Sequence, residues 1–244
     1  MMKFAPHITI YGFEEAIDFQ NEVIWTFSKN LVGISSIRHR LNIHIVNSKT
    51  SERESLEGSI KSVWKYISID QYVKASEQKR KEILLELIVS CFLSIGERLE
   101  WNIATINQAK DKSISEQICF QYRSKSRFNK KRNIEAAIEL TLSKDRVSIW
   151  GLFCVKNQEE PIRRHIVDTY AHQISTIRNF GAPKWLDELN FGFQFKNGMS
   201  ISVSPNNGES CWSKTRNKKD DWFQKTIIYD RDNSLEDMVK LVNC

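Results

Sequence analysis

The chain has few cysteines, and their spacing favours neither a disulfide framework nor a metal site. The five cysteines are an odd number without a C-x-x-C pair: Cys91, Cys119, Cys154, Cys211 and Cys244. Paired cysteines at regular spacing are the usual sign of a disulfide scaffold or a thiolate zinc site. Neither is expected here, and this use of cysteine is typical of the reducing cytoplasm, where we expect the protein to be located.

The sequence also has no long hydrophobic run. The first seven residues contain no apolar segment of the kind found in signal peptides. The longest apolar run, residues 83–95, is too short for a transmembrane helix and contains Glu86. We therefore expect a soluble protein that is not exported and has no membrane partner.

Common catalytic signatures are missing. The sequence contains no G-x-x-x-x-G-K-[ST], G-x-G-x-x-G, G-x-S-x-G or H-E-x-x-H motif, which excludes the families that depend on them. Glu135 and Glu139 are candidates for a metal-dependent nuclease pair, but their spacing of four on an expected strand simply places both on its polar face. The sequence thus predicts no catalytic, metal-binding or cofactor-binding residue, and a protein that is not an enzyme.

What the chain does have is a concentrated positive charge. Lys and Arg number 36 against 30 Asp and Glu, a net charge of +6. Residues 122–132, the basic loop, hold six basic residues and no acidic one: Arg123, Lys125, Arg127, Lys130, Lys131 and Arg132. A positive charge that is concentrated in one stretch favours binding of an anionic partner. The same charge spread over the whole surface would favour it less.

The aromatic residues of the basic loop extend its chemistry. Tyr122 and Phe128 lie among the cations, and stacking on bases together with phosphate contacts is typical of proteins that bind single-stranded nucleic acid. The competing interpretation is a mobile, solvated hairpin tip whose aromatic side chains fold into the core.

Apolar spacing predicts helices mainly in the first half. A short strand is expected over residues 8–11, a helix over 14–31, and a second strand around Leu41, Ile43 and Ile45, whose side chains alternate with more polar ones. The clearest helix runs over residues 77–99 after Ser76, with a shorter one over 102–111.

Domain organisation follows from the polar residues between these elements. Residues 47–58 form an expected exposed loop and the best candidate boundary. We expect one domain over residues 1–244, with a subdivision into 1–58 and 59–244 as the alternative.

Alternating segments predict strands in the second half. Ile114, Ile118, Phe120 and Tyr122 are expected on one face of a strand that ends where the basic loop begins. Residues 134–142 and 147–155 alternate in the same way, and their short connection requires antiparallel neighbours. Trp150 is expected on the face opposite the core, either at a protein interface or beneath a second layer.

A hairpin and a tail complete the pattern. Asn197 and Gly198 predict a type I′ turn between two strands. Further on, a strand over residues 222–229 and a short helix from Ser234 are expected. The fold class is α+β, with helices packed on a mainly antiparallel sheet that forms a meander in the second half.

Four segments resemble uncharacterised small bacterial cytosolic proteins, some of which look like immunity proteins of toxin systems: residues 72–74, 84–88, 99–102 and 184–187. The likeness extends over roughly residues 64–204 and is carried by ordinary helix and strand residues. It implies non-catalytic protein binding and transfers no site residue. Because inhibitors of nucleases are often acidic, the basic character of this chain favours a toxin with an acidic surface.

Three functions follow in order of preference. The first is a cytosolic binding protein of the immunity type, whose surface includes Trp150 and the basic loop with Phe128. The alternative is a nucleic-acid-binding module that uses the same loop. A metal-dependent enzyme ranks third, and the sequence indicates no oligomeric state.

Overall fold

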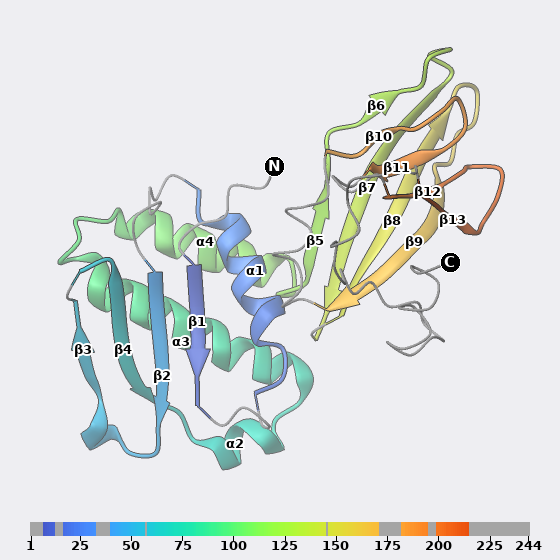
Figure 1. The fold of residues 1–244 in the computed structure, drawn as a ribbon. Coiled ribbons are helices and arrows are strands. Elements are labelled where there is room, and N and C mark those ends of the chain that lie inside the picture. The colour runs from blue at the N-terminus through green and yellow to red at the C-terminus, as the bar shows by residue number, and fades with distance from the viewer. Residues whose placement is uncertain are drawn as a thin grey trace. The chain divides into compact units, whose positions relative to one another are not determined.

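The chain folds as two compact units, residues 1–120 and residues 121–244. The computed structural model describes residues 7–12, 17–32, 40–56, 58–144, 146–170, 182–194 and 199–214. The first unit carries the helices and the second consists of mostly antiparallel sheets (Figure 1), which confirms the α+β class. Residues 47–56 lie inside the first unit. The expected single domain and its alternative subdivision after Gly58 stay predictions.

The first unit contains a sheet of order β1-β2-β4-β3. Its strands β1 (His7–Tyr11), β2 (Arg40–Val46) and β4 (Ile60–Tyr66) are parallel, and the short β3 (Arg53–Ser55) pairs antiparallel with β4. The predicted alternation in β2 is confirmed, because Leu41, Ile43 and Ile45 are buried. Alternate residues of a strand point to opposite faces, so these three define the core side of the sheet.

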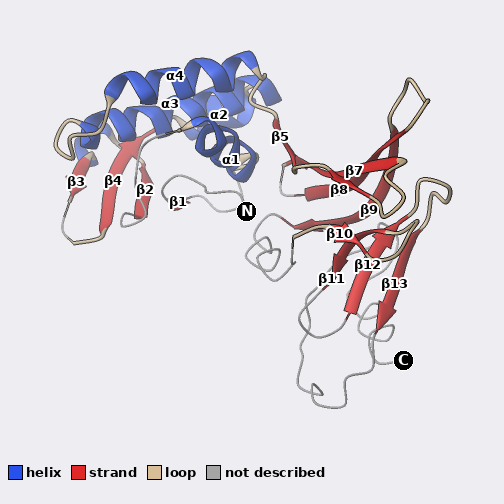
Figure 2. Ribbon diagram, turned by 90° about the horizontal axis from the view of Figure 1, so that it is seen from above, coloured by secondary structure: helices blue, strands red, loops and turns tan. Residues whose placement is uncertain are grey.

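Helices cover that core side. They are α1 (Gln20–Asn30), α2 (Ile69–Lys74), α3 (Glu77–Gly96) and α4 (Ile103–Ser115), and Figure 2 shows α1, α3 and α4 along one face of the sheet. The Ser76 hydroxyl accepts a hydrogen bond from the Lys79 N–H, and Asn102 caps α4. Leu84, Ile88 and Phe92 of α3 are buried, so the predicted central helix is confirmed.

Two predictions in the first unit are wrong. The helix expected over residues 14–31 begins only at Gln20, because Phe19 adopts a left-handed conformation with φ 67° at its N-cap; residues 13–16 lie outside the described part. The expected exposed loop at 47–58 contains a 3-10 turn, η1 (Lys49–Ser51), and the edge strand β3. Polar side chains suit an edge strand as well as a loop, so composition did not distinguish the two.

The second unit has two antiparallel sheets. One has the order β5-β7-β8-β9, with β6 also paired to β7, and the other has the order β10-β11-β12-β13. The strands are β5 (Phe120–Arg123), β6 (Arg127–Phe128), β7 (Ile134–Ser143), β8 (Arg146–Val155), β9 (Ile162–Tyr170), β10 (Lys184–Trp185), β11 (Phe191–Gln194), β12 (Met199–Val203) and β13 (Ser210–Lys214). The expected meander is therefore divided between two sheets.

The predicted antiparallel pairing of β7 and β8 is confirmed. Ile134 lies opposite Val155, and Leu142 lies opposite Val147. One face of this hairpin packs on the second sheet, where the ring centroids of Phe153 and Phe191 are 6.3 Å apart. The core of this unit therefore lies between the sheets.

Other predictions in the second half have mixed outcomes. Ile114 belongs to α4, and the strand expected from that residue begins only at Phe120. The predicted antiparallel pairing of the strands on either side of Asn197 and Gly198 is confirmed, with Phe191 opposite Val203. The turn itself lies outside the described residues, as does everything expected after residue 214. Among the described helices, none is long and apolar enough to cross a membrane.

Candidate interaction site at the basic loop

The basic loop runs from the end of β5 to the start of β7, as the sequence predicts, but it is more than a turn. Its middle forms β6, in which Arg127 lies opposite Ala136 and Phe128 opposite Glu135 of β7. Between β5 and β6, the Ser124 N–H donates to the Ile138 carbonyl at 2.8 Å. The loop therefore follows the edge of β7 and carries its cations along that edge.

All six basic side chains of the loop are exposed. Lys131 is paired, with its Nζ 2.8 Å from Glu188 Oε2. Within the described residues the other five form no ion pair: Arg123, Lys125, Arg127, Lys130 and Arg132. The loop thus presents five cations without an ion pair on one short stretch, although Lys130 also interacts electrostatically with Glu188, and the stretch is a source of positive potential at the surface.

A buried asparagine organises this stretch. The side chain of Asn129 is 4% exposed; its Oδ1 accepts hydrogen bonds from the backbone N–H groups of Asn133 at 3.1 Å and Ile134 at 3.2 Å. Its Nδ2 donates to Asn133 Oδ1 at 2.8 Å, and the Arg132 N–H donates to its carbonyl at 3.0 Å. These bonds define the backbone path from β6 to β7 and hence the positions of the cations.

The two aromatic residues of the loop differ in exposure. Phe128 is 54% exposed, whereas Tyr122 is half-buried. Phe128 is therefore the aromatic residue of the loop best placed to contact a partner.

A second segment, the Asp187 turn (residues 187–190), lies beside the loop. Trp185 Nε1 donates to the Arg127 carbonyl at 2.9 Å, which holds β10 next to β6 (Figure 1). Asn129 Nδ2 reaches the Glu188 carbonyl at 3.4 Å. Residues far apart in sequence therefore form one surface.

The turn is closed by its own aspartate. Asp187 Oδ1 accepts hydrogen bonds from the N–H groups of Leu189 and Asn190, each at 2.8 Å. Partial burial alone would raise the pKa of Asp187, but the bonds from the Asn190 side chain and from these N–H groups lower it. The carboxylate stays ionised and fixes the turn that displays Leu189.

The ion pair between the two segments shifts both of its members. The hydrogen bond and charge of Glu188 raise the pKa of Lys131, and the same contact with Lys131 lowers the pKa of Glu188. Both groups are exposed, so solvent screens the pair and its contribution to stability is small. Its structural consequence is that the Glu188 carboxylate, like that of Asp187, lies beside the cations of the loop.

Trp150, which we expected at the same interface, lies on a neighbouring strand of the same sheet. It lies in the middle of β8, opposite Glu139 of β7. Glu139 is four residues along β7 from Glu135, the partner of Phe128, and this separation is about 13 Å on a strand. Trp150 is therefore distant from Phe128, whereas the first residues of the loop lie closer to it, because the Ser124 N–H is bonded to the carbonyl of Ile138, the neighbour of Glu139.

The surroundings of Trp150 are polar. The Arg163 guanidinium lies 3.9 Å from its ring centroid, while Arg163 Nη2 is 2.7 Å from Glu139 Oε1. Glu139 is thus engaged by arginine and by Gln121 Nε2 at 2.9 Å. Among the described residues no group of three or more His, Cys, Asp or Glu is arranged to hold a metal ion.

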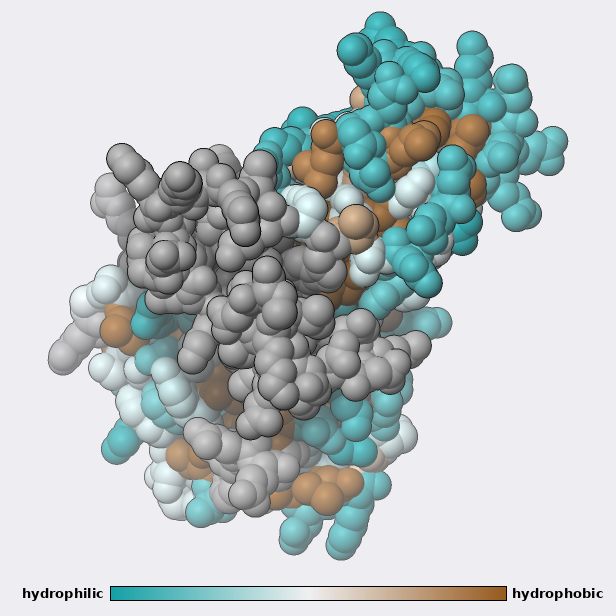
Figure 3. Space-filling view, turned by 45° about the vertical axis from the view of Figure 1, so that its right-hand side comes forward, coloured by the Kyte–Doolittle hydropathy of each residue, from teal (hydrophilic) through white to brown (hydrophobic). Residues whose placement is uncertain are grey.

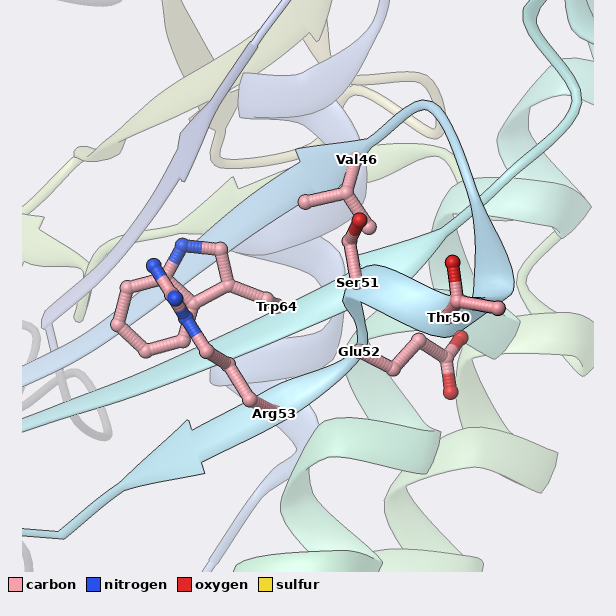
Figure 4. Close-up of a pocket in the computed structure, with 6 residues that line it drawn as sticks. All are labelled: Val46, Thr50, Ser51, Glu52, Arg53 and Trp64. Carbon is pink, nitrogen blue, oxygen red and sulfur yellow. The ribbon is translucent and has the colours of Figure 1, made fainter.

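A shallow pocket of about 520 Å³ lies beside Trp64 in the first unit. Figure 4 shows the Arg53 side chain over the ring of Trp64, with a guanidinium-to-centroid distance of 4.4 Å. His44 stacks on Trp64 at 4.7 Å. Arginine and histidine thus already occupy positions against this ring, and nothing else at the pocket indicates a ligand.

Sequence reasoning did not find four residues that shape the surface: Asn129, Trp185, Glu188 and Leu189. The bond between Asn129 and Glu188 spans 59 residues, and such a contact has no local signature. The single usable signal was the Asp187 and Asn190 pair, whose side chains favour turns.

On the face of the second unit visible in Figure 3, hydrophilic side chains predominate and surround smaller apolar patches. No family model matches the chain, and comparisons with curated proteins and with solved structures find no match.

Proposed function

We propose that this protein is a non-catalytic binding protein whose basic loop docks an acidic surface of a partner protein. The observation that carries the proposal is the row of five exposed cations without an ion pair among the described residues. Complementary charge speeds encounter and excludes wrong partners. A buried residue, Asn129, anchors the loop, so less conformational entropy is lost on binding.

The finer form of the proposal is an immunity-type inhibitor that acts on a bacterial toxin in the cytoplasm. It rests on the sequence resemblance and on the basic loop, which suits an acidic toxin surface better than it suits imitation of nucleic acid. The partner to test is the product of the gene adjacent to its own.

Co-expression tests both forms. The loop variant replaces Lys125, Lys130 and Arg132 by Gln, and a charge-matched control replaces Lys49, Lys74 and Lys112 of the first unit, which are also exposed. We expect the wild type and the control to capture the neighbouring product and to restore growth, and the loop variant to do so weakly. If the neighbouring gene product remains fully toxic in the presence of the wild type, the protein is not its inhibitor. If the loop variant captures that product as well as the wild type does, the basic loop is not the docking site.

A nucleic-acid-binding function is the second candidate, and the exposure of Phe128 favours it, because an exposed ring among cations can stack on a base. Fluorescence anisotropy with single-stranded and duplex probes over a range of salt concentrations tests it. The loop variant should then bind more weakly and with a flatter salt dependence. Absence of binding to both probes at low salt would remove this candidate.

A further inference from the structure

Exposed apolar side chains in the second unit are concentrated beside the basic loop. In the described part of that unit, the large apolar residues that are exposed are Phe128, at 54%, and Leu189, at 47%. The segments that carry them are bonded to each other through Asn129, Trp185 and Glu188. Two independent segments therefore bring apolar groups to the same positively charged surface.

Neither side chain is exposed through lack of local structure. Phe128 belongs to β6 and is paired with β7, and Leu189 follows Asp187 in a turn closed by two 2.8 Å bonds to the carboxylate. Leaving such groups in water costs free energy that burial against a partner recovers. Apolar groups surrounded by charged ones are typical of the central contacts of protein interfaces.

We propose that Phe128 and Leu189 are apolar anchors of this interface and that its ligand is an acidic peptide segment with apolar side chains between its carboxylates. This inference rests on the proposed function and deepens it. The unpaired cations contact the carboxylates, and the two anchors contact the apolar side chains.

The carboxylate of Glu188 favours a peptide over other anionic ligands. Lys131 lowers the pKa of Glu188, so a negative charge stays within the surface next to Leu189. A phosphate backbone or an anionic lipid surface brings only negative charge to that position, whereas a peptide can place a neutral group there. Leu189 is aliphatic and offers no ring on which a base could stack.

The test compares two labelled peptides of equal length and charge, one with Leu and Phe between its Glu residues and one with Ser and Gly. Phe128→Ser and Leu189→Ser are measured beside Ile114→Ser, a control whose side chain is also 47% exposed but lies on α4 in the first unit. We expect the wild type to bind the apolar peptide at least tenfold more tightly. Each anchor variant should bind that peptide roughly tenfold more weakly and bind the other peptide as the wild type does. The control should keep the wild-type affinity for both peptides.

Each alternative result has a defined meaning. Equal affinity for the two peptides, both weakened by the loop variant, would overturn the anchors while the proposed acidic partner stands. No binding of either peptide would overturn the proposed function and the anchors together. Tighter binding to oligothymidylate, or to phosphatidylcholine vesicles with about one third phosphatidylserine, would overturn the peptide ligand in favour of nucleic acid or a membrane.

Discussion

Asn129 Oδ1 accepts a hydrogen bond from the backbone N–H of Ile134 at 3.2 Å, and the N–H of Asn129 donates to the Ile134 carbonyl at 2.9 Å. Two bonds between the same residues thus close the basic loop where β7 begins. Asn129→Ala leaves the buried Ile134 N–H without its side-chain acceptor, so we expect the free energy of unfolding to fall by about 1–3 kcal/mol. Urea unfolding measures the loss.

Hydrogen exchange localises the same effect. Exchange of the Asn133 and Ile134 amides should accelerate in Asn129→Ala, because both N–H groups donate to the missing oxygen. Asn206→Ala is the control, since Asn206 is exposed and its side chain makes no hydrogen bond in the described structure. Unchanged exchange at both amides would show that the Asn129 side chain does not close the loop.

Gly192 occupies a position in β11 where no side chain fits. A Cβ at this residue would lie 2.0 Å from the Ile201 carbonyl oxygen and 2.7 Å from the Ser202 Cα of β12. Because backbone atoms must move to relieve such a contact, we expect Gly192→Ala to destabilise the protein by about 3 kcal/mol or more. Gly208→Ala, with no atom within 4 Å of its Cβ, should leave the melting temperature nearly unchanged. Equal melting temperatures for the two variants would contradict the close approach of β11 and β12.

Local patterns predicted the parts of the fold that depend on near neighbours in the sequence. The antiparallel pairing of β7 and β8 follows from alternation and a short connection, and α3 follows from its apolar face after Ser76. Ile114 and Ile118 show where this fails. A spacing of four fits one face of a helix and one face of a strand equally well; Ile114 belongs to α4, and Ile118 lies in the turn between α4 and β5.

The candidate site was predicted only in its basic half. The charge of the loop is visible in the sequence. The other half of the site, the Asp187 turn, is placed beside the loop by the hydrogen bonds of Asn129 to Glu188 and of Trp185 to Arg127. Such contacts form only when the two sheets pack together. The secondary-structure propensities of the residues therefore carry no information about them. Trp150 was assigned to the interface because alternation places it on the face opposite the core, and only strand register shows that it lies about four residues along the strands from Phe128.

Asp168 should make stability depend on pH at the acidic end. Burial alone would raise the pKa of this carboxyl group, but hydrogen bonds from Ser148 and His165 and the charges of His165 and Arg146 lower it. A pKa lower in the folded than in the unfolded state stabilises the fold above the unfolded value of about 3.9, and the stabilisation is lost as pH falls through the folded value.

Asp168→Asn tests this sign. We expect the free energy of unfolding to fall by about 1 kcal/mol at neutral pH, allowing for screening, and the difference from wild type to shrink below about pH 3.9. Glu159→Gln, at an exposed carboxylate without an ion pair in the described structure, is the control. If Asp168→Asn lowers the free energy of unfolding by the same amount at neutral pH and below about pH 3.9, the charge of Asp168 does not stabilise the fold.

His44 provides a spectroscopic test of the first unit. Its ring stacks between Tyr11, at a centroid distance of 4.9 Å, and Trp64, at 4.7 Å. Burial first, and the charge of Arg53 second, lower its pKa below the ordinary 6.5. Arg53→Gln should therefore move the NMR titration midpoint of His44 upward, whereas Arg40→Gln, with the same change of charge at the start of β2, should move it less. Equal shifts would mean that the net charge of the protein, and not the proximity of Arg53 to Trp64 and His44, lowers the pKa of His44.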